Sequence, residues 1–245
     1  MLDNQFIFTS ESVSEGHPDK ICDQISDAVV DYYLSNCDSP ELARVACETM
    51  VTTNKVFIAG EVRGDGNLKK VNNDVIEEIT RKVIKWIGYE QETFHWKDVD
   101  ININLHSQSE DIGMGVDASN KNDEGAGDQG IMFGYATDET DTFMPIPIKL
   151  SHELLLELRK NRISGDINGL GPDAKSQFSI IYKDNMPINI HSLVLSVQHK
   201  NEYRTEDVRN IVHPIIKKII PNGWECAEEN IFINPTGNFV IGGPH

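Results

Sequence analysis

The sequence is poor in cysteine and contains no long hydrophobic run. Its four cysteines form no C-x-x-C pair, and residues 1–5 lack the basic and apolar regions of a signal peptide. We therefore expect a reducing, cytoplasmic environment. No apolar stretch approaches the length that a bilayer requires, so we expect no membrane span.

Positive charge is also scarce. The chain of 245 residues has 22 Lys and Arg against 39 Asp and Glu, for a formal net charge of −17. A molecule with this charge repels phosphate backbones and anionic lipids, so we expect neither nucleic acid nor a membrane as a partner. A small anionic ligand would have to be held locally, by a few lysines, a helix N-terminus or a divalent cation.

Residues 8–20 read F-T-S-E-S-V-S-E-G-H-P-D-K and precede an amphipathic pattern. Gly16 lets the backbone approach a ligand, and His17 can donate a hydrogen bond or a proton. The helix N-terminus favours negative charge, and Asp19 is an oxygen ligand of the kind that Mg²⁺ prefers. From composition, two interpretations stay open: a metal–phosphate site, or an ordinary helix start with solvated charges.

Hydrophobic periodicity predicts two units, each with the order helix, two strands, helix, strand. The expected elements are a helix at 18–34, strands at 44–52 and 55–63, a helix at 72–87 and a strand at 99–105, then a helix at 149–160, strands at 177–183 and 189–198, a helix at 205–219 and a strand at 231–233. This order predicts an α+β fold in which a pair of helices covers one face of each sheet.

Two carboxylates interrupt the strands of the first unit. Glu48 and Glu61 lie in alternating, half-buried patterns, where a buried carboxylate needs a cation or several hydrogen-bond donors. The alternative is that both side chains point to solvent.

The segment 106–128 loses hydrophobic periodicity, and we interpret it as a mobile loop over a site. It leads into G-A-G-D-Q-G at 125–130, which matches G-x-G-x-x-G. A dinucleotide site needs a strand before this motif and a helix after it, whereas here a polar loop precedes and the strand-like 131–135 follows, so we reject that interpretation. We expect the glycines to permit a tight backbone bend that presents Asp128 and Gln129.

Two later motifs have open interpretations. In P-D-A-K-S at 172–176, just before an expected strand, Lys175 either contacts phosphate or is solvated. In the turn-rich N-P-T-G-N-F at 234–239, Phe239 either stacks on a base or belongs to the core.

Five motifs together resemble the methionine adenosyltransferases, also called S-adenosylmethionine synthetases. They are F-T-S-E-S-V-S-E-G-H-P-D-K, A-R-V-A-C-E-T, G-A-G-D-Q-G, P-D-A-K-S and F-I-N-P-T-G-N-F-V-I-G-G-P, and they span the chain in the family's order. The resemblance implies related α+β domains: a central-type domain at 16–111, a gating loop and glycine-rich segment at 112–130, and an N-terminal-type domain formed by 1–15 and 131–245. By the same resemblance, we expect the family's third, C-terminal domain to be largely absent from this chain.

The resemblance also implies a reaction. The methionine sulfur attacks C5′ of ATP and displaces tripolyphosphate, which is then hydrolysed to pyrophosphate and phosphate. The implied partners are ATP, L-methionine and further copies of the chain in a homotetramer built as a dimer of dimers, and the implied cofactors are Mg²⁺ and K⁺.

By similarity, His17 contacts the triphosphate near the departing oxygen and Lys175 supplies a positive contact to phosphate, so both are expected to be catalytic. The other implied roles are ATP binding by Asp173, Ala174, Asn238 and Phe239, methionine binding by Glu61, Gln108 and Asp128, Mg²⁺ binding by Asp19 and K⁺ binding by Glu48.

The chain departs from the family at several points. The gate reads Q-S-E-D-I where many relatives have Q-S-P-D-I, and Asn238 stands where many bacterial members have arginine. Beyond His245 the family continues through further phosphate-binding and methionine-binding residues, so we expect little synthesis by this chain alone. The alternatives are a noncatalytic assembly or regulatory module, and a tripolyphosphatase without transfer activity.

Overall fold

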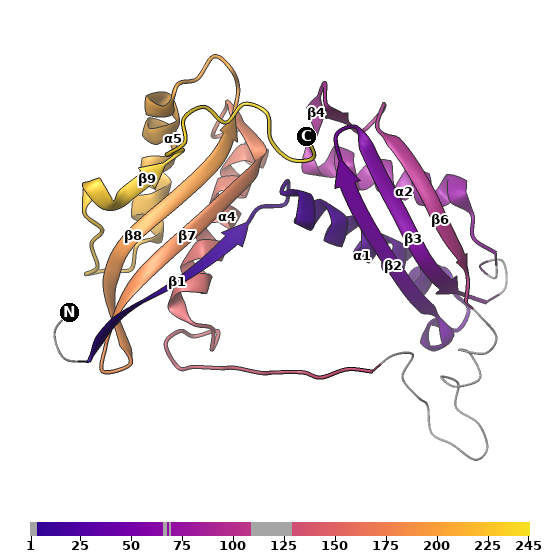
Figure 1. The fold of residues 1–245 in the computed structure, drawn as a ribbon, viewed down its shortest axis with the longest axis horizontal. Coiled ribbons are helices and arrows are strands. Elements are labelled where there is room, and N and C mark those ends of the chain that lie inside the picture. Colours follow the sequence, from indigo (N-terminus) through magenta and orange to yellow (C-terminus); the bar gives the residue numbers. More distant parts are fainter. Residues whose placement is uncertain (1–3, 66–67, 69, 109–128) are drawn as a thin grey trace. The chain divides into compact units, whose positions relative to one another are not determined.

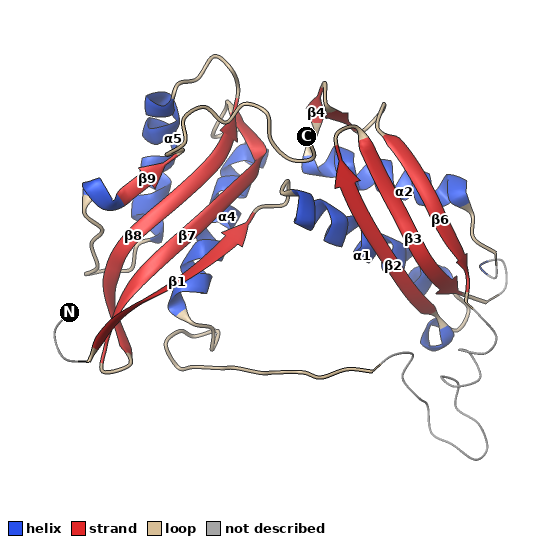
Figure 2. Ribbon diagram, in the orientation of Figure 1, coloured by secondary structure: helices blue, strands red, loops and turns tan. Residues whose placement is uncertain are grey.

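The computed structural model describes residues 4–65, 68, 70–108 and 129–245. Contacts divide the chain into two compact units. Unit 1 comprises Met1–Lys20, Ile87–Gln91 and Ala136–His245, and unit 2 comprises Ile21–Trp86 and Glu92–Tyr135. Each unit has one main sheet with helices on one face, as the ribbon views show (Figures 1 and 2), which confirms the expected α+β class.

Unit 2 is built on the sheet β2-β3-β6. Its strands are β2 (Arg44–Thr52), β3 (Lys55–Arg63) and β6 (Asp100–Ser107), with β2 antiparallel and β6 parallel to β3. Helices α1 (Pro18–Asn36) and α2 (Asn73–Ile87) lie behind this sheet in Figure 1. In α1 the buried residues Ile21, Ile25, Val29 and Tyr33 recur every four positions. This spacing places them on one face of the helix, which packs into the core.

Unit 1 is built on the sheet β1-β7-β8-β9. Its strands are β1 (Gln5–Val13), β7 (Leu170–Lys183), β8 (Met186–His199) and β9 (Ile231–Ile233), and only the β8–β9 pair is parallel. Helices α4 (Ile146–Ser164) and α5 (Thr205–Ile219) share one apolar core with the sheet. The remaining short elements are η1 (Pro40–Leu42), β4 (Glu90–Gln91), β5 (Phe94–His95) and η3 (Glu228–Asn230).

The order helix, two strands, helix, strand occurs twice, as predicted, but unit 1 has one strand more. β1 is a nine-residue strand where the sequence suggested only a short apolar stretch, and it pairs with β7 from Gln5↔Lys183 to Val13↔Lys175. Its polar residues obscured the strand, because alternate positions lie on a sheet face without helices. β7 begins at Leu170, so the P-D-A-K-S motif lies within a strand and not before one.

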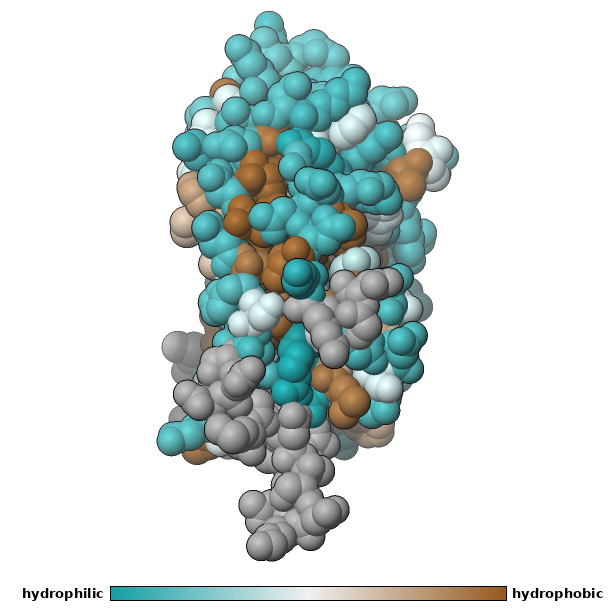
Figure 3. Space-filling model, turned by 90° about the vertical axis from the view of Figure 1, so that its right-hand side faces the viewer, coloured by the Kyte–Doolittle hydropathy of each residue, from teal (hydrophilic) through white to brown (hydrophobic). Residues whose placement is uncertain are grey.

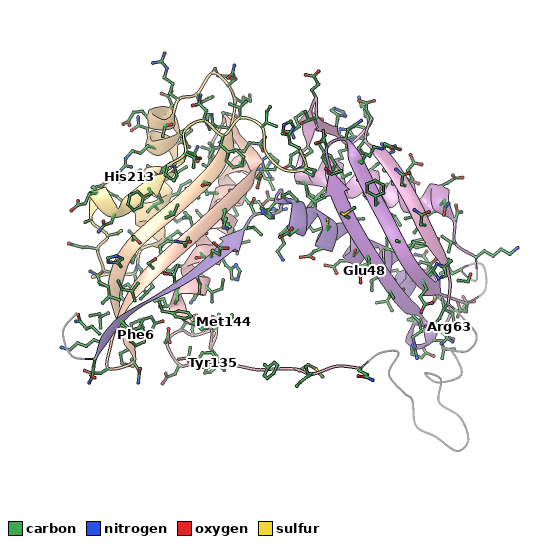
Figure 4. All side chains as sticks on the ribbon, in the orientation of Figure 1. Phe6, Glu48, Arg63, Tyr135, Met144 and His213 are labelled. Carbon is green, nitrogen blue, oxygen red and sulfur yellow. The ribbon has the colours of Figure 1, made fainter. Side chains whose placement is uncertain are left out.

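The strand-like segment 131–135 forms no strand, which corrects that expectation. It has no regular secondary structure, and its large apolar side chains are exposed, from 77% at Tyr135, labelled in Figure 4, to 91% at Phe133. An apolar composition favours a strand only where a neighbouring strand pairs with it. The expected gate at 112–130 falls largely on residues 109–128, which lie outside the described residues, as does Asp128.

One side of the molecule has a mixed polar and apolar surface (Figure 3). Figure 3 looks onto the side of unit 2 that carries β6 and shows a mostly hydrophilic face with hydrophobic residues near its centre. Such a mixture is normal for a protein surface. Among the helices in the described part of the chain, none combines the length and the apolar character that crossing a membrane would require.

Candidate functional site

In unit 1 the approach to α1 is joined to the start of β7 through Ser14. The Ser14 hydroxyl donates to the Pro172 carbonyl at 2.6 Å and accepts from the Ala174 amide at 2.7 Å, while the Ser14 amide donates to the Ala174 carbonyl at 2.8 Å. The hydroxyl is buried and satisfied as both donor and acceptor. Two segments about 160 positions apart are therefore held together at this point.

Gly16 lies against the same strand. A Cβ atom at this position would lie 2.5 Å from the carbonyl carbon and oxygen of Pro172, so only glycine fits. The Gly16 amide donates to the Pro172 carbonyl at 3.2 Å, and the Gly16 carbonyl accepts from the Tyr89 hydroxyl at 2.5 Å. Burial raises the pKa of Tyr89 far above its usual value, so the phenol stays protonated and remains a donor.

His17 is oriented by its own turn. The Asp19 amide donates to His17 Nδ1 at 3.2 Å, and a backbone amide can only donate, so in the neutral ring Nε2 carries the hydrogen. The His17 side chain is 28% exposed, and the Asp19 carboxylate, 85% exposed, lies 3.7 Å from Nδ1. A donor nitrogen and a carboxylate are thus both available at the start of the helix.

A β-bulge in β7 sets the direction of the Asp173 side chain. Residues 171–173 of β7 oppose only Gln198 of β8, and such an insertion re-aims side chains. The Gln198 side chain fills the bulge: its Oε1 accepts from the Asp173 amide at 3.4 Å, and its Nε2 donates to the Val240 carbonyl at 3.1 Å and to Gln91 Oε1 at 3.0 Å. Asp173 leaves the regular ladder as a result.

The Asp173 carboxylate is buried and accepts from the Gly243 amide at 2.7 Å. Burial raises its pKa, and the Gly243 hydrogen bond and the charge of a nearby protonated His17 oppose that rise. Gly243 has a φ of +66°, and a Cβ there would lie 2.0 Å from the Tyr89 hydroxyl. Asp173, His17 and the C-terminal glycines therefore meet in one place.

Phe239 lies beside Asp173. Its amide and carbonyl both hydrogen-bond to His199, and its ring is half-buried. A Cβ added to Gly242 would lie 3.0 Å from Phe239 Cε2 and 3.1 Å from the Asp173 Cβ, so this glycine separates the ring from the carboxylate. Asn238 is exposed next to it.

Lys175 lies on the face of the sheet that the helices of unit 1 leave open, since its neighbour Ala174 belongs to the core under those helices. The Lys175 ammonium is 2.9 Å from the Glu11 carboxylate, and both side chains are about half exposed. An ion pair this exposed is worth about 0–1 kcal/mol, so the lysine can exchange its partner for phosphate at little cost.

Unit 2 holds a separate group of candidate residues, which includes Glu48 and Glu61. Ala46 pairs with Glu61, and Glu48, labelled on β2 in Figure 4, pairs with Ala59, so the two glutamates are diagonal neighbours on one sheet face. Glu48 is exposed, and the Glu61 carboxylate lies 4.0 Å from the His106 imidazole.

Gln108 follows β6 in the same unit. Its amide donates to the Val62 carbonyl at 3.0 Å, while its Oε1 is buried without a hydrogen-bond partner in the described part of the chain. An unpaired buried acceptor costs about 1–3 kcal/mol. A ligand that brings a donor here would recover that cost.

Within the described ranges, no three His, Cys, Asp or Glu side chains gather as a metal site. Asp19 fits Mg²⁺ in another way, since that ion is commonly held by one or two carboxylates together with substrate phosphates and water. Glu48 and Glu61 offer oxygen ligands on one face but do not by themselves enclose a K⁺ ion.

The comparison with family models decides what kind of protein carries these residues. Residues 5–110 match the model for the N-terminal domain of S-adenosylmethionine synthetase, and residues 123–239 match the model for its central domain. The chain belongs to the S-adenosylmethionine synthetase family. The names of the two models run opposite to the labels expected for 16–111 and for 1–15 with 131–245, and that division into domains stays a prediction.

Several similar proteins are named S-adenosylmethionine synthase. The chain is 53% identical over 244 residues to one from Parvibaculum lavamentivorans, covering 100% of the chain and 61% of the relative. It is 54% identical to S-adenosylmethionine synthase 2 of Rhodospirillum rubrum, with the same coverage, and 54% identical to the synthase of Ruegeria pomeroyi, covering 100% of the chain and 62% of the relative. The chain thus spans about 61% of the length of these synthetases.

Of the predicted site residues, unit 1 brings together His17, Asp173 and Phe239, with Lys175 on the adjoining sheet face. The Ala174 side chain lies instead in the core, and both backbone groups of Ala174 pair with Ser14. Sequence reasoning missed the residues that support them, namely Ser14, Tyr89, Gln198, His199 and Gly243. The sequence did contain one indication of two of these residues. Gln198 and His199 are consecutive polar residues at the end of β8, where they interrupt the alternation of apolar and polar residues. Nothing near Tyr89 in the sequence indicated its contact with Gly16.

Proposed function

We propose that this chain takes part in S-adenosylmethionine synthesis from ATP and L-methionine, and that unit 1 holds the nucleotide. The observation that carries the proposal is the convergence of Gly16, His17, Asp173 and Phe239 within a chain that matches both family models. These residues come from three distant segments and are connected by hydrogen bonds of backbone and side chains. Such a preorganised arrangement suits a ligand that must be held in one orientation.

In the proposed reaction the methionine sulfur attacks C5′ of ATP, and the C5′–O bond breaks to release tripolyphosphate. Because the displacement occurs at carbon, catalysis must come from positioning and from stabilising the charge on the departing oxygen. His17 suits this role, since its Nε2 carries a hydrogen to donate. Lys175 leaves Glu11 and adds positive charge to the polyphosphate, which is afterwards hydrolysed to pyrophosphate and phosphate.

We assign the other nucleotide contacts to the remaining candidate residues of unit 1. The Phe239 ring stacks on adenine, with Asn238 and Ala174 beside the nucleotide, and the Asp173 carboxylate accepts a hydrogen bond from it. Mg²⁺ bound at Asp19 would neutralise part of the polyphosphate charge. K⁺ is assigned to Glu48 as part of the same proposal.

We assign the methionine to Glu61, Gln108 and Asp128, since two carboxylates and an amide oxygen suit an ammonium group. Gln108 Oε1 supports this assignment because it lacks a partner among the described residues. A cytoplasmic homotetramer, built as a dimer of dimers, completes the proposal.

An assay of product and phosphate release with ATP, L-methionine, Mg²⁺ and K⁺ tests the reaction, and calorimetry with Mg-ATP tests the nucleotide half alone. In an intact synthetase, as distinct from this chain alone, we expect His17→Ala to lower turnover by at least about 100-fold while ATP affinity changes less than about threefold. His191→Ala, an exposed histidine on β8, is the matched control. Binding without turnover favours a chain that acts with further subunits, and neither binding nor turnover contradicts the proposal.

A further inference from the structure

His199, the last residue of β8, uses both nitrogens of a ring that is only 1% exposed. Its Nδ1 lies 3.0 Å from the Lys200 carbonyl oxygen, and its Nε2 lies 3.0 Å from the Phe239 amide nitrogen. A carbonyl can only accept and an amide can only donate, so Nδ1 carries the hydrogen and Nε2 is the acceptor. This neutral tautomer is the opposite of the one that the Asp19 amide selects at His17.

His199 also holds Phe239 by a second bond, because the His199 amide donates to the Phe239 carbonyl at 2.8 Å. One residue therefore satisfies both backbone groups of Phe239, and a ring nitrogen takes the place that a carbonyl has in a normal ladder. The ladder between β8 and β9 ends at Leu195↔Ile233, so no further strand pairing orients residue 239.

The chain between the end of β9 at Ile233 and Phe239 forms a closed turn. The Asn234 side chain pairs with both backbone groups of Val197, at 2.8 and 3.0 Å, and Gly237 has a φ of +104°. After the turn, the chain returns to β8 at His199. The backbone of Phe239 is thus held by two hydrogen bonds to His199, and the only one of the two that a side chain makes is the bond to Nε2.

We propose that His199 is a positioning residue that presents the Phe239 ring as the stacking surface for the nucleotide base, through the acceptor Nε2. The inference rests on the proposed nucleotide site, and it adds a requirement that stacking alone does not contain. A residue at 199 must accept a hydrogen bond at the distance of Nε2. Glutamine meets that requirement, and methionine, of similar length, does not.

The test compares His199→Gln with His199→Met. Loss of the acceptor leaves a buried amide unpaired, so we expect His199→Met to weaken Mg-ATP binding by about tenfold or more and His199→Gln to retain most of it. Hydrogen exchange at the Phe239 amide should accelerate in the methionine variant only. In the unaltered chain, nitrogen NMR should show Nδ1 protonated and Nε2 unprotonated.

A double-mutant cycle separates positioning from general stability. If His199 acts by positioning the Phe239 ring, His199→Met has no further effect on ATP affinity in a Phe239→Ala background. Equal losses in both backgrounds, equal behaviour of the Gln and Met variants, or a protonated Nε2 would overturn the inference. Absence of ATP binding by the unaltered chain would instead refute the nucleotide site, and exchange at the Phe239 amide would then decide the structural contact by itself.

Discussion

The candidate residues of unit 1 and those of unit 2 differ in how many of their hydrogen-bonding groups have partners within the chain. In unit 1, Ser14, Asp173 and Gln198 are buried, and each makes hydrogen bonds to segments that are remote in sequence. In unit 2, Glu48 is exposed on a sheet face and the buried Oε1 of Gln108 lacks a partner in the described ranges.

The difference suggests how the two halves of the proposed reaction are supported. The proposed nucleotide side is preorganised by contacts within unit 1, so substitutions of the buried residues that make those contacts should disturb structure and binding together. On the proposed methionine side, Glu61 lies beside His106, and Gln108 Oε1 has no partner among the described residues. Substitutions of exposed polar residues of unit 2 should therefore affect function more than stability.

The largest effect is expected from Gly243→Ala. The positive φ and the contact with Tyr89 leave no room for a Cβ, so we expect a loss of about 1–3 kcal/mol in the free energy of unfolding. Mg-ATP binding should fall below detection, because Asp173 loses its aligned donor. Urea unfolding and calorimetry measure both. Gly134→Ala, in open space within unit 2, is the control, and identical behaviour of the two variants would contradict the account.

Phe239→Ala should act mainly on binding. Loss of a stacking ring costs about 1–3 kcal/mol per base, so ATP affinity should fall by roughly 5- to 150-fold while the unfolding midpoint changes little. Phe232→Ala on β9, also a surface phenylalanine, should leave affinity unchanged. Similar losses in both variants would show that the effect is not specific to the ring at 239.

Ser14→Ala should lower the free energy of unfolding by about 1–3 kcal/mol, because it leaves the Ala174 amide without its acceptor. Ser192→Ala, at a half-buried position of β8, is the control and should cost less than about 0.5 kcal/mol. Chemical denaturation compares the two. Equal stabilities would mean that Ser14 does not join the two segments.

Asp173→Asn should change the pH dependence of stability. Burial raises the pKa of Asp173 in the folded state above its unfolded value, so stability is highest below the unfolded pKa and falls as pH rises through the folded pKa. The amide removes this decline and keeps an acceptor for Gly243. Between about pH 3 and 7, the free energy of unfolding of the unaltered chain minus that of the Asp173→Asn variant should fall as pH rises, and an increase in this difference would reverse the assigned sign.

The smallest effect is expected from Glu48→Gln in unit 2. An exposed carboxylate contributes less than about 0.5 kcal/mol, so the unfolding curve should coincide with that of the unaltered chain. A loss comparable to that of Ser14→Ala would show that unit 2 is also built around its polar groups, and the contrast between the units would disappear.

Much of the fold could be predicted because its signals are local. The strands at 44–52 and 55–63 alternate strictly and the helix at 205–219 has a clear apolar face, so all three occur with the predicted bounds. β1 was missed because a strand at a sheet edge does not need apolar residues on its open face. The segment 131–135 was misjudged because pairing, which composition does not reveal, decides whether a strand forms.

The candidate site also has a part that the sequence predicts and a part that it does not. Motifs identified His17, Asp173 and Phe239 because each lies in a recognisable stretch. The supporting contacts of Tyr89, Gln198 and His199 join positions 40 to 107 residues apart, and such separations leave no periodic signal in a single sequence.

We propose above all that unit 1 by itself presents the nucleotide site. A titration with Mg-ATP, followed through the amide chemical shifts, can show this residue by residue. We expect shifts confined to the segments around His17, Asp173 and Phe239, with the amides of Glu48 and Glu61 unchanged. Shifts centred on unit 2, or no shifts at saturating Mg-ATP, would contradict it.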